Sequence, residues 1–238
     1  MKWFHLIFLG VALCCLAAFG PGVAPKKALR EKPQKAPSSQ PAPKRAAPSR
    51  DALVLPQPPL DVAIFAGGCF WCMESALEKV PGVFSVISGY TGGPEERPAY
   101  ADVASGKTGH QEAVWVVFHT EQVSFDVLLE VFWRNIDPTQ GNGQFADLGP
   151  QYIASIFVRT PEQRERATKS LATLTASKKF APLKITTTIK DFDKFWPAET
   201  YHQDYYRLHP EVYDRYYEAS GRGPFIRQHW GASQGKQK

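Results

Sequence analysis

Two cysteines, Cys69 and Cys72, are separated by two aromatic residues and follow directly on a pair of glycines in the segment GGCFWC. The thiolate is the reactive form of cysteine, and the unpaired N–H groups and dipole at a helix start lower the pKa of a thiol there. The glycines let backbone approach closely, and Phe70 and Trp71 can line an apolar pocket. The segment therefore predicts a nucleophile at Cys69, against the alternative of a cysteine that only packs in a core.

A buried strand that turns into a helix is needed to place Cys69 in this way. Residues 60–66 are almost continuously apolar and predict that strand, which enters the Gly-Gly turn. Phe70, Met73, Leu77 and Val80 then recur at helical spacing until a Pro-Gly pair stops the pattern. Cys69 therefore stands at the predicted strand-to-helix junction.

The remaining segments alternate in the same manner. Strand patterns occupy residues 83–90, 113–119, 153–159 and 183–190, and helix patterns occupy residues 124–136 and 161–180. Ser124 is a predicted N-cap, and Pro161 opens the second of these helices at its first turn. Loops are expected at residues 91–109 and 137–152, and an aromatic, partly helical tail at residues 198–220. The alternation predicts an α+β domain with a sheet layer and a helix layer.

Charge is unevenly distributed along the chain. The 238 residues carry a formal charge of +5, but residues 1–50 hold nine Lys and Arg against one acid, which leaves nineteen basic against twenty-two acidic residues afterwards. A nucleic-acid-binding domain needs a basic surface within the folded part. We therefore expect no nucleic-acid partner.

Residues 1–59 have the composition of a targeting segment followed by a spacer. An apolar run over residues 3–19 predicts a signal peptide or membrane anchor within residues 1–24, in which Cys14 and Cys15 serve as small apolar filler. Residues 25–59 are rich in Pro, Ala and Lys, which predicts a disordered linker. The catalytic domain would then span residues 60–238. This organisation predicts an exported or membrane-anchored, extracytoplasmic protein that touches the membrane through its N-terminal segment.

Several short motifs follow one another in a fixed order after Leu60. They are GGCFW at 67–71, GYTGG at 89–93, PAY at 98–100, SGKTGHQEAV at 105–114, DPTQ at 137–140, DLGPQY at 147–152 and FWPAETYHQDYY at 195–206. Together they resemble the A-class peptide methionine sulfoxide reductases, over roughly residues 62–206.

The resemblance implies a split βαβ, ferredoxin-like core, no metal or organic cofactor, and reduction of methionine S-sulfoxide, free or in proteins. Carried onto matching positions, it implies that Cys69 is the nucleophile and that Glu112 is the acid. A sulfoxide sulfur is a poor electrophile until its oxygen is protonated, so the chemistry requires an acid at that oxygen. Desolvation among apolar groups would raise the pKa of a carboxyl such as Glu112 enough for it to be protonated.

The resemblance assigns further roles around this pair. Phe70 and Trp71 would hold the methyl group of the sulfoxide, and Tyr100 and Tyr152 would hydrogen-bond its oxygen. Asp147 completes the predicted pocket.

Three places depart from the family pattern. Ile136 stands where His is usual, Gln144-Phe145-Ala146-Asp147 replaces Gln-Gly-Asn-Asp, and Ile153 stands where Arg is common. These changes bear on peptide docking and on the loop more than on the chemistry.

Attack by Cys69 would release methionine and leave a sulfenic acid that must be reduced. Many relatives use a cysteine near the C-terminus, but this chain has none after Cys72. Cys72 is therefore the internal candidate for a disulfide with Cys69, which a thioredoxin-like protein or a small thiol would reduce. The alternative is an external thiol that attacks the sulfenic acid directly.

Other interpretations remain at this point. A Cys-x-x-Cys at a helix start also fits a membrane-tethered thiol-disulfide oxidoreductase, and a non-catalytic module that binds oxidised methionine is a third class. His202, His209 and Glu211 invite a metal site, but their spacing fits no recognised ligand set. We expect a monomer that uses no metal.

Overall fold

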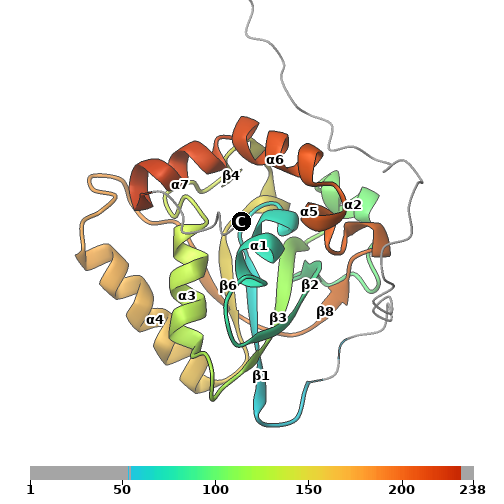
Figure 1. The fold of residues 1–238 in the computed structure, drawn as a ribbon, viewed down its shortest axis with the longest axis horizontal. Helices are drawn as coiled ribbons and strands as arrows, with labels where there is room; N and C mark the ends of the chain where they lie inside the picture. The colour runs from blue at the N-terminus through green and yellow to red at the C-terminus, as the bar shows by residue number, and fades with distance from the viewer. Residues whose placement is uncertain (1–52, 54, 232–238) are drawn as a thin grey trace, which may run out of the picture. The chain divides into compact units, whose positions relative to one another are not determined.

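A six-stranded sheet forms the centre of the described chain, which in this computed structural model comprises residue 53 and residues 55–231 (Figure 1). The strand order is β7-β6-β1-β3-β2-β8, and β4 and β5 form a separate pair. The strands are β1 (Leu60–Ala66), β2 (Val83–Thr91), β3 (Gln111–His119), β4 (Gly143–Gln144), β5 (Asp147–Leu148), β6 (Ser155–Val158), β7 (Thr188–Asp191) and β8 (Phe195–Pro197).

Two helical crossovers build the core of this sheet. Helix α1 (Phe70–Leu77) connects β1 to β2, and α3 (Phe125–Arg134) connects β3 to β6. Within the run β6-β1-β3-β2 each strand is antiparallel to the next, and each crossover leaves one strand between the two that it joins. This is a split βαβ core, and the predicted α+β fold class is confirmed.

Both faces of the central strands are buried, which explains their almost continuous apolar sequence. Successive side chains of a strand point to opposite faces. Ala63 and Phe65 of β1 accordingly join the apolar cluster that contains α1 and α3, whereas Val62 and Ile64 join a second cluster with Trp115. The helices therefore cover one face, and a smaller apolar layer covers the other.

Helix α3 begins as the sequence predicts. The Ser124 side chain accepts a hydrogen bond from the backbone N–H of Val127, and the helix buries an apolar stripe against β1. The ring of Phe132 stacks on Phe65 with centroids 5.1 Å apart. Capping and core contact together fix the position of α3.

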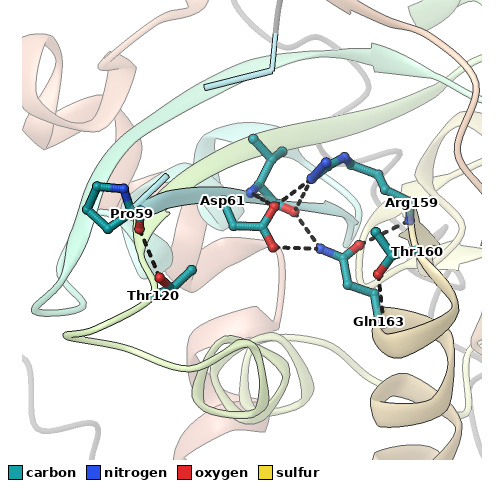
Figure 2. Close-up of polar contacts among 7 residues, drawn as sticks. Pro59, Asp61, Thr120, Arg159, Thr160 and Gln163 are labelled. Carbon is teal, nitrogen blue, oxygen red and sulfur yellow. Dashed lines mark hydrogen bonds and ion pairs between the residues drawn. The ribbon is translucent and has the colours of Figure 1, made fainter. Parts of the chain in front are cut away.

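Helix α4 (Pro161–Ala176) is tied to the start of β1 by a polar network (Figure 2). Asp61 accepts from the Arg159 guanidinium at 2.7 Å, and the Gln163 side chain donates to the Val62 carbonyl at 2.8 Å. Thr160 caps the helix by accepting from the Gln163 N–H at 3.1 Å. These contacts hold the junction of β6 and α4 against β1.

Several short elements differ from the sequence-based expectation. The predicted loop at residues 91–109 contains α2 (Tyr100–Ala104), and the loop at residues 137–152 contains β4, β5 and the 3₁₀ helix η1 (Pro150–Tyr152). Strand β8 was not predicted, and the strand expected at residues 183–190 is reduced to β7. Elements of two to five residues carry no periodicity of their own, so tertiary contacts determine them.

The tail is helical, as predicted in part. It contains η2 (Thr200–His202), α5 (Tyr205–Leu208), α6 (Pro210–Ala219) and α7 (Arg222–Trp230). In Figure 1 these C-terminal helices, in red tones, lie at the end of the sheet where β1 passes into α1. The tail therefore lies where Cys69 begins the helix.

The predicted signal or anchor segment, and the linker before residue 53, lie outside the described residues. Within residues 55–231, the structure contains no helix of the length and apolarity that a membrane crossing requires. The boundary of the catalytic domain at residue 60 remains a prediction.

Candidate active site

Cys69 lies where the sequence predicts it, between β1 and α1. It is the N-cap residue of α1 and is fully buried. Its carbonyl accepts from the backbone N–H of Cys72 at 3.1 Å and of Met73 at 3.4 Å. Cys69 and Cys72 are not joined by a disulfide in this structure. The thiol of Cys69 therefore stands at the N-terminal end of a helix, as the predicted nucleophile requires.

Steric contacts require glycine at both positions before Cys69. A Cβ atom on Gly67 would lie 2.5 Å from the Met73 sulfur. Gly68 has a φ of +79°, and a Cβ there would lie 2.5 Å from Cβ of Gln144 and 2.8 Å from Nη2 of Arg222. The turn is therefore packed on both sides, and only glycine fits without displacement of its neighbours.

Glu112 is brought directly to this turn. It is a fully buried residue of β3, and its Oε2 accepts from the backbone N–H of Phe70 at 3.0 Å. It pairs in register with Tyr90 of β2. Glu112 is therefore buried and bound to the backbone of the residue after Cys69, and its role as the acid stays a prediction.

Tyr90 is held as a proton donor beside Glu112. Its hydroxyl donates to Glu199 Oε2 at 2.8 Å. Burial raises the pKa of Tyr90, and the carboxylates of Glu199 and Glu112 raise it further. Tyr90 therefore stays protonated throughout the neutral range.

Aromatic side chains surround Phe70. Its ring centroid lies 5.0 Å from His202, 6.0 Å from Tyr90 and 6.5 Å from Tyr100. His202 in turn lies 4.2 Å from Tyr100. These rings come from α1, β2, α2 and η2, so four separate segments line this side of the site.

Trp71 faces the C-terminal helices. Its ring stacks on Tyr205 with centroids 3.8 Å apart and planes within 6°, and meets the edge of Tyr216 at 6.2 Å. The Tyr216 hydroxyl donates to Asp147 Oδ2. Burial raises the pKa of Tyr216, as do the charges of Cys69 and Asp147. Asp147 therefore joins the site through Tyr216.

Tyr100 and Tyr152 come from separate elements that polar side chains hold together. Tyr100 is the first residue of α2, and its N–H donates to Glu199 at 3.0 Å. Tyr152 is buried at the end of η1. The Gln151 side chain donates to the Ala104 carbonyl at 2.9 Å, which joins η1 to α2.

A second glutamine joins η1 to β3. The Gln111 side chain, one residue before Glu112, donates to the carbonyl of Ile153 at 2.6 Å. The contact of Ile153 is made by its backbone, so the change from the usual Arg leaves it intact.

The other departures from the family pattern pack against the same turn. Ile136 is fully buried, and its Cγ2 would lie 3.1 Å from a Cβ on Gly67. Gln144 accepts from the Asp137 N–H at 2.8 Å and donates to the Asp137 carbonyl at 2.9 Å. The changed loop therefore keeps a fixed contact with the DPTQ segment.

None of the predicted site residues lines the groove that lies along α3 and α4 in the described part of the chain. That groove has a volume of about 1060 Å³. Arg166 lines it and pairs with Asp126 at 2.8 Å and with Glu162 at 3.0 Å. Charged side chains of both signs line the groove beside Trp133 and Trp230, and it lies apart from the predicted sulfoxide pocket.

Among the described residues, Glu74, Glu78 and Asp204 place carboxylate oxygens within 4.8 Å of one another. Burial raises the pKa of Glu74 well above its usual range, although the Asp204 N–H acts in the opposite direction. Arg207 pairs at 3.1 Å with Glu78 and at 3.1 Å with Asp204. The chain thus supplies a cation to this group itself.

Comparison with known proteins decides the family. Residues 61–234 match the model of the family described as peptide methionine sulfoxide reductase. The chain belongs to the peptide methionine sulfoxide reductase family.

The match with this chain spans nearly the whole length of each relative. Peptide methionine sulfoxide reductase MsrA of Bacillus subtilis is 47% identical over 172 residues, 72% of this chain and 97% of that protein. The MsrA of Limosilactobacillus reuteri is also 47% identical, with 72% of this chain and 97% of that protein covered. The family resemblance predicted from the motif order is confirmed.

Solved structures of the family share the fold. Methionine sulfoxide reductase A of Corynebacterium diphtheriae is 32% identical with a TM-score of 0.61, over 65% of this chain and 77% of that chain. Mxr1 from Saccharomyces cerevisiae in reduced form is 27% identical with a TM-score of 0.59, over 64% of this chain and 87% of that chain.

The motifs did not reveal every residue at this reductase's site. Tyr205 stacks on Trp71, Tyr216 contacts it edge-to-face, and Arg222 donates to the Gly67 carbonyl at 2.9 Å. The aromatic tail was a signal for the two tyrosines. Nothing in the sequence distinguished Arg222 from surface arginines.

Gly68→Ala should impair the reductase because alanine strains the positive φ and drives a methyl group against Gln144 and Arg222. We expect a loss of about 1–3 kcal/mol of unfolding free energy and a fall in turnover, measured by denaturant unfolding and by a sulfoxide reduction assay.

Gly106→Ala is the matched control. Its φ is +73°, but a Cβ there would lie an ordinary 3.5 Å from the nearest atom, on the Gln151 side chain. It should share the backbone strain and keep turnover. Equal losses of turnover in both variants would contradict a special role for packing at Gly68.

Proposed function

We propose that Cys69 and Glu112 of this thiol-dependent peptide-methionine (S)-S-oxide reductase carry out the reduction of methionine sulfoxide, free or in proteins. The hydrogen bond from the Phe70 N–H to Glu112 at 3.0 Å is the observation that carries this assignment. The bond holds the buried Glu112 carboxyl at the backbone of Phe70, the residue that follows Cys69. An acid and a nucleophile then share one apolar pocket.

The first half-reaction transfers oxygen. The Cys69 thiolate attacks the sulfoxide sulfur while Glu112 donates a proton to the sulfoxide oxygen. The methionine sulfur is reduced and leaves as methionine. The Cys69 sulfur is oxidised and carries the oxygen as a sulfenic acid.

The surrounding side chains bind the substrate in this proposal. Phe70 and Trp71 hold the methyl group, and their packing against tyrosine and histidine rings supports an apolar pocket of fixed shape. Tyr100 and Tyr152 donate to the sulfoxide oxygen. Asp147 is bound to Tyr216 and orients this side of the pocket.

Cys72 closes the cycle. Its position in the first turn of α1, with its N–H bound to the Cys69 carbonyl, supports formation of a disulfide between the two residues. A thioredoxin-like protein or a small thiol then reduces that disulfide. Direct attack of an external thiol on the sulfenic acid is the competing route.

Glu112→Gln should slow sulfoxide reduction by roughly 10²–10⁴-fold, because the amide cannot donate the proton that activates the sulfoxide. The assay is the mass loss of a methionine sulfoxide peptide with dithiothreitol. Cys69→Ser should fold and show no turnover. An unchanged rate in Glu112→Gln, or turnover by folded Cys69→Ser, would refute the assigned roles.

This assay also separates the other two interpretations. Reduction of a general disulfide without loss of oxygen from the peptide would favour a thiol-disulfide oxidoreductase. Binding of the peptide without turnover would favour a recognition module.

Cys72→Ser should release one methionine per enzyme and then stall with a sulfenic acid on Cys69. Thioredoxin-driven turnover should fall sharply, whereas dithiothreitol should restore part of the rate because it attacks the sulfenic acid directly. Wild type given excess substrate without reductant should contain a Cys69–Cys72 disulfide, read by mass. Full thioredoxin-driven turnover by Cys72→Ser would mean that recycling is intermolecular.

We further propose a monomer that is exported or anchored by its N-terminal segment and acts outside the cytoplasm. The apolar run at residues 3–19 and the Pro-rich spacer after it support this location. The full chain should fractionate with membranes or the exported pool, and variant Leu9→Arg, which places a charge within the run, should shift it toward the cytosolic fraction. A wild-type protein found in the cytosol alone would contradict the proposal.

A further inference from the structure

Arg222 is a buried cation at the strand-to-helix turn. It is 1% exposed, although it lies on the last helix of the chain. Its Nη2 donates to the Gly67 carbonyl at 2.9 Å, and its Nη1 donates to the Asn135 carbonyl. A Cβ on Gly68 would lie 2.8 Å from the same Nη2. The guanidinium therefore lies directly against the turn that presents Cys69.

Helix stability does not explain this placement. Arg222 is the first residue of α7, where the helix dipole disfavours a positive charge. None of the ion pairs found within residues 55–231 includes Arg222, so two neutral carbonyls are its hydrogen-bond acceptors there. A buried charge without an opposite charge is costly. Negative charge near the guanidinium therefore stabilises Arg222 in this position.

The two site cysteines are among the nearby groups that can become anionic. Burial lowers the pKa of Arg222, but the charges of Cys72, Tyr216, Cys69 and Asp147 outweigh that effect and leave the pKa raised. Cys72 contributes the most among these four. Cys72 lies in the first turn of α1, with its N–H bound to the Cys69 carbonyl, and the guanidinium binds the Gly67 carbonyl at the start of the strand-to-helix turn. This placement brings the cation near the Cys72 thiol, so each affects the ionisation of the other.

Three phenols near Cys72 do not supply a positive charge. Tyr213, Tyr216 and Tyr217 of α6 face it, and burial raises the pKa of each, to which the charge of Cys72 adds. These phenols stay neutral at pH values where a thiol titrates. Arg222 is the positive charge that this helical cover brings to Cys72.

Phe145 holds the guanidinium in place. Its ring lies 4.6 Å from the Arg222 guanidinium carbon and 5.4 Å from the Phe225 ring. Phe145 has a φ of +56°, in the left-handed region that disfavours side chains, at the position where the family usually has glycine. The strained backbone is offset by an aromatic face stacked on the cation.

We propose that Arg222 is a positioning residue that stabilises Cys72 as a thiolate, so that Cys72 can attack the sulfenic acid on Cys69. The attack rests on the proposed recycling by Cys72. In that step the Cys72 sulfur forms a bond to the Cys69 sulfur, and the S–O bond of the sulfenic acid breaks. The Cys72 sulfur is oxidised, the Cys69 sulfur is reduced, and hydroxide takes a proton and leaves as water.

The test measures the pKa of Cys72 in the full-length Cys69→Ser protein. Iodoacetamide labels the protein across a pH range, and peptide mass spectrometry reads Cys72 apart from Cys14 and Cys15. The midpoint of the rate profile reports the thiol pKa, whereas access to the buried thiol changes only the plateau. Arg222→Gln in this protein should raise the midpoint by at least about one pH unit, roughly a tenfold loss of thiolate at neutral pH.

Two further variants separate charge from packing. Arg222→Lys keeps the charge and should restore most of the shift. Arg227→Gln removes an exposed arginine of the same helix that pairs with Glu218, and should leave the midpoint unchanged. An unchanged midpoint in folded Arg222→Gln, or an equal rise with Lys, would overturn the proposal.

A last measurement needs no change at Arg222. With Arg222 in place, the Cys72 midpoint should lie below the ordinary thiol value of about 8.5, because burial alone would raise it. A midpoint at or above that value overturns the proposal even if Arg222→Gln fails to fold.

The recycling role is read separately, as the rate of Cys69–Cys72 disulfide formation after one turnover in protein with both cysteines. Arg222→Gln should slow that rate about tenfold at neutral pH. If Cys72→Ser keeps full thioredoxin-driven turnover, recycling by Cys72 fails. The midpoint of Cys72 still decides whether Arg222 holds the thiolate.

Discussion

The turn from β1 into α1 is held between a buried carboxyl group and a buried guanidinium, and the rest of the site depends on this turn. Glu112 accepts from the N–H of Phe70 on one side, and Arg222 donates to the carbonyl of Gly67 on the other. Each of the two side chains binds a backbone group that the turn leaves without a partner in the sheet or helix. The turn therefore fixes Cys69 by its backbone and leaves the thiol available for chemistry.

The strand order is what makes this arrangement possible. Because β3 lies beside β1, Glu112 reaches the start of α1 from the neighbouring strand. The C-terminal helices approach from elsewhere and bring Tyr205, Tyr216 and Arg222. The sheet thus supplies the acid, and the tail supplies the aromatic cover and the cation. Neither part alone encloses the thiol.

The sequence was sufficient for the parts whose signal is local. The strand before Cys69, the cap at Ser124 and the helix start at Pro161 follow from periodicity and capping chemistry, and the structure has all three. The link from Gln151 to Ala104 could not be predicted in this way, because it joins residues 47 apart in the chain. Arg222 was missed for the same reason, since it lies 155 residues from the carbonyl that it binds. Burial of a long charged side chain is decided by tertiary packing, which the local pattern does not contain.

The changed loop shows how a departure from the family pattern can serve the same site. A phenylalanine with positive φ costs stability that glycine would not. The Phe145 ring lies over the guanidinium of Arg222 and contacts Phe225. The cation–π contact offsets the backbone strain at Phe145. Gln144, the residue before it, fixes the loop to the backbone of Asp137 and packs against Gly68. The loop that brings Asp147 to the pocket therefore also confines Arg222, which couples the substrate side of the site to the side that holds the two thiols.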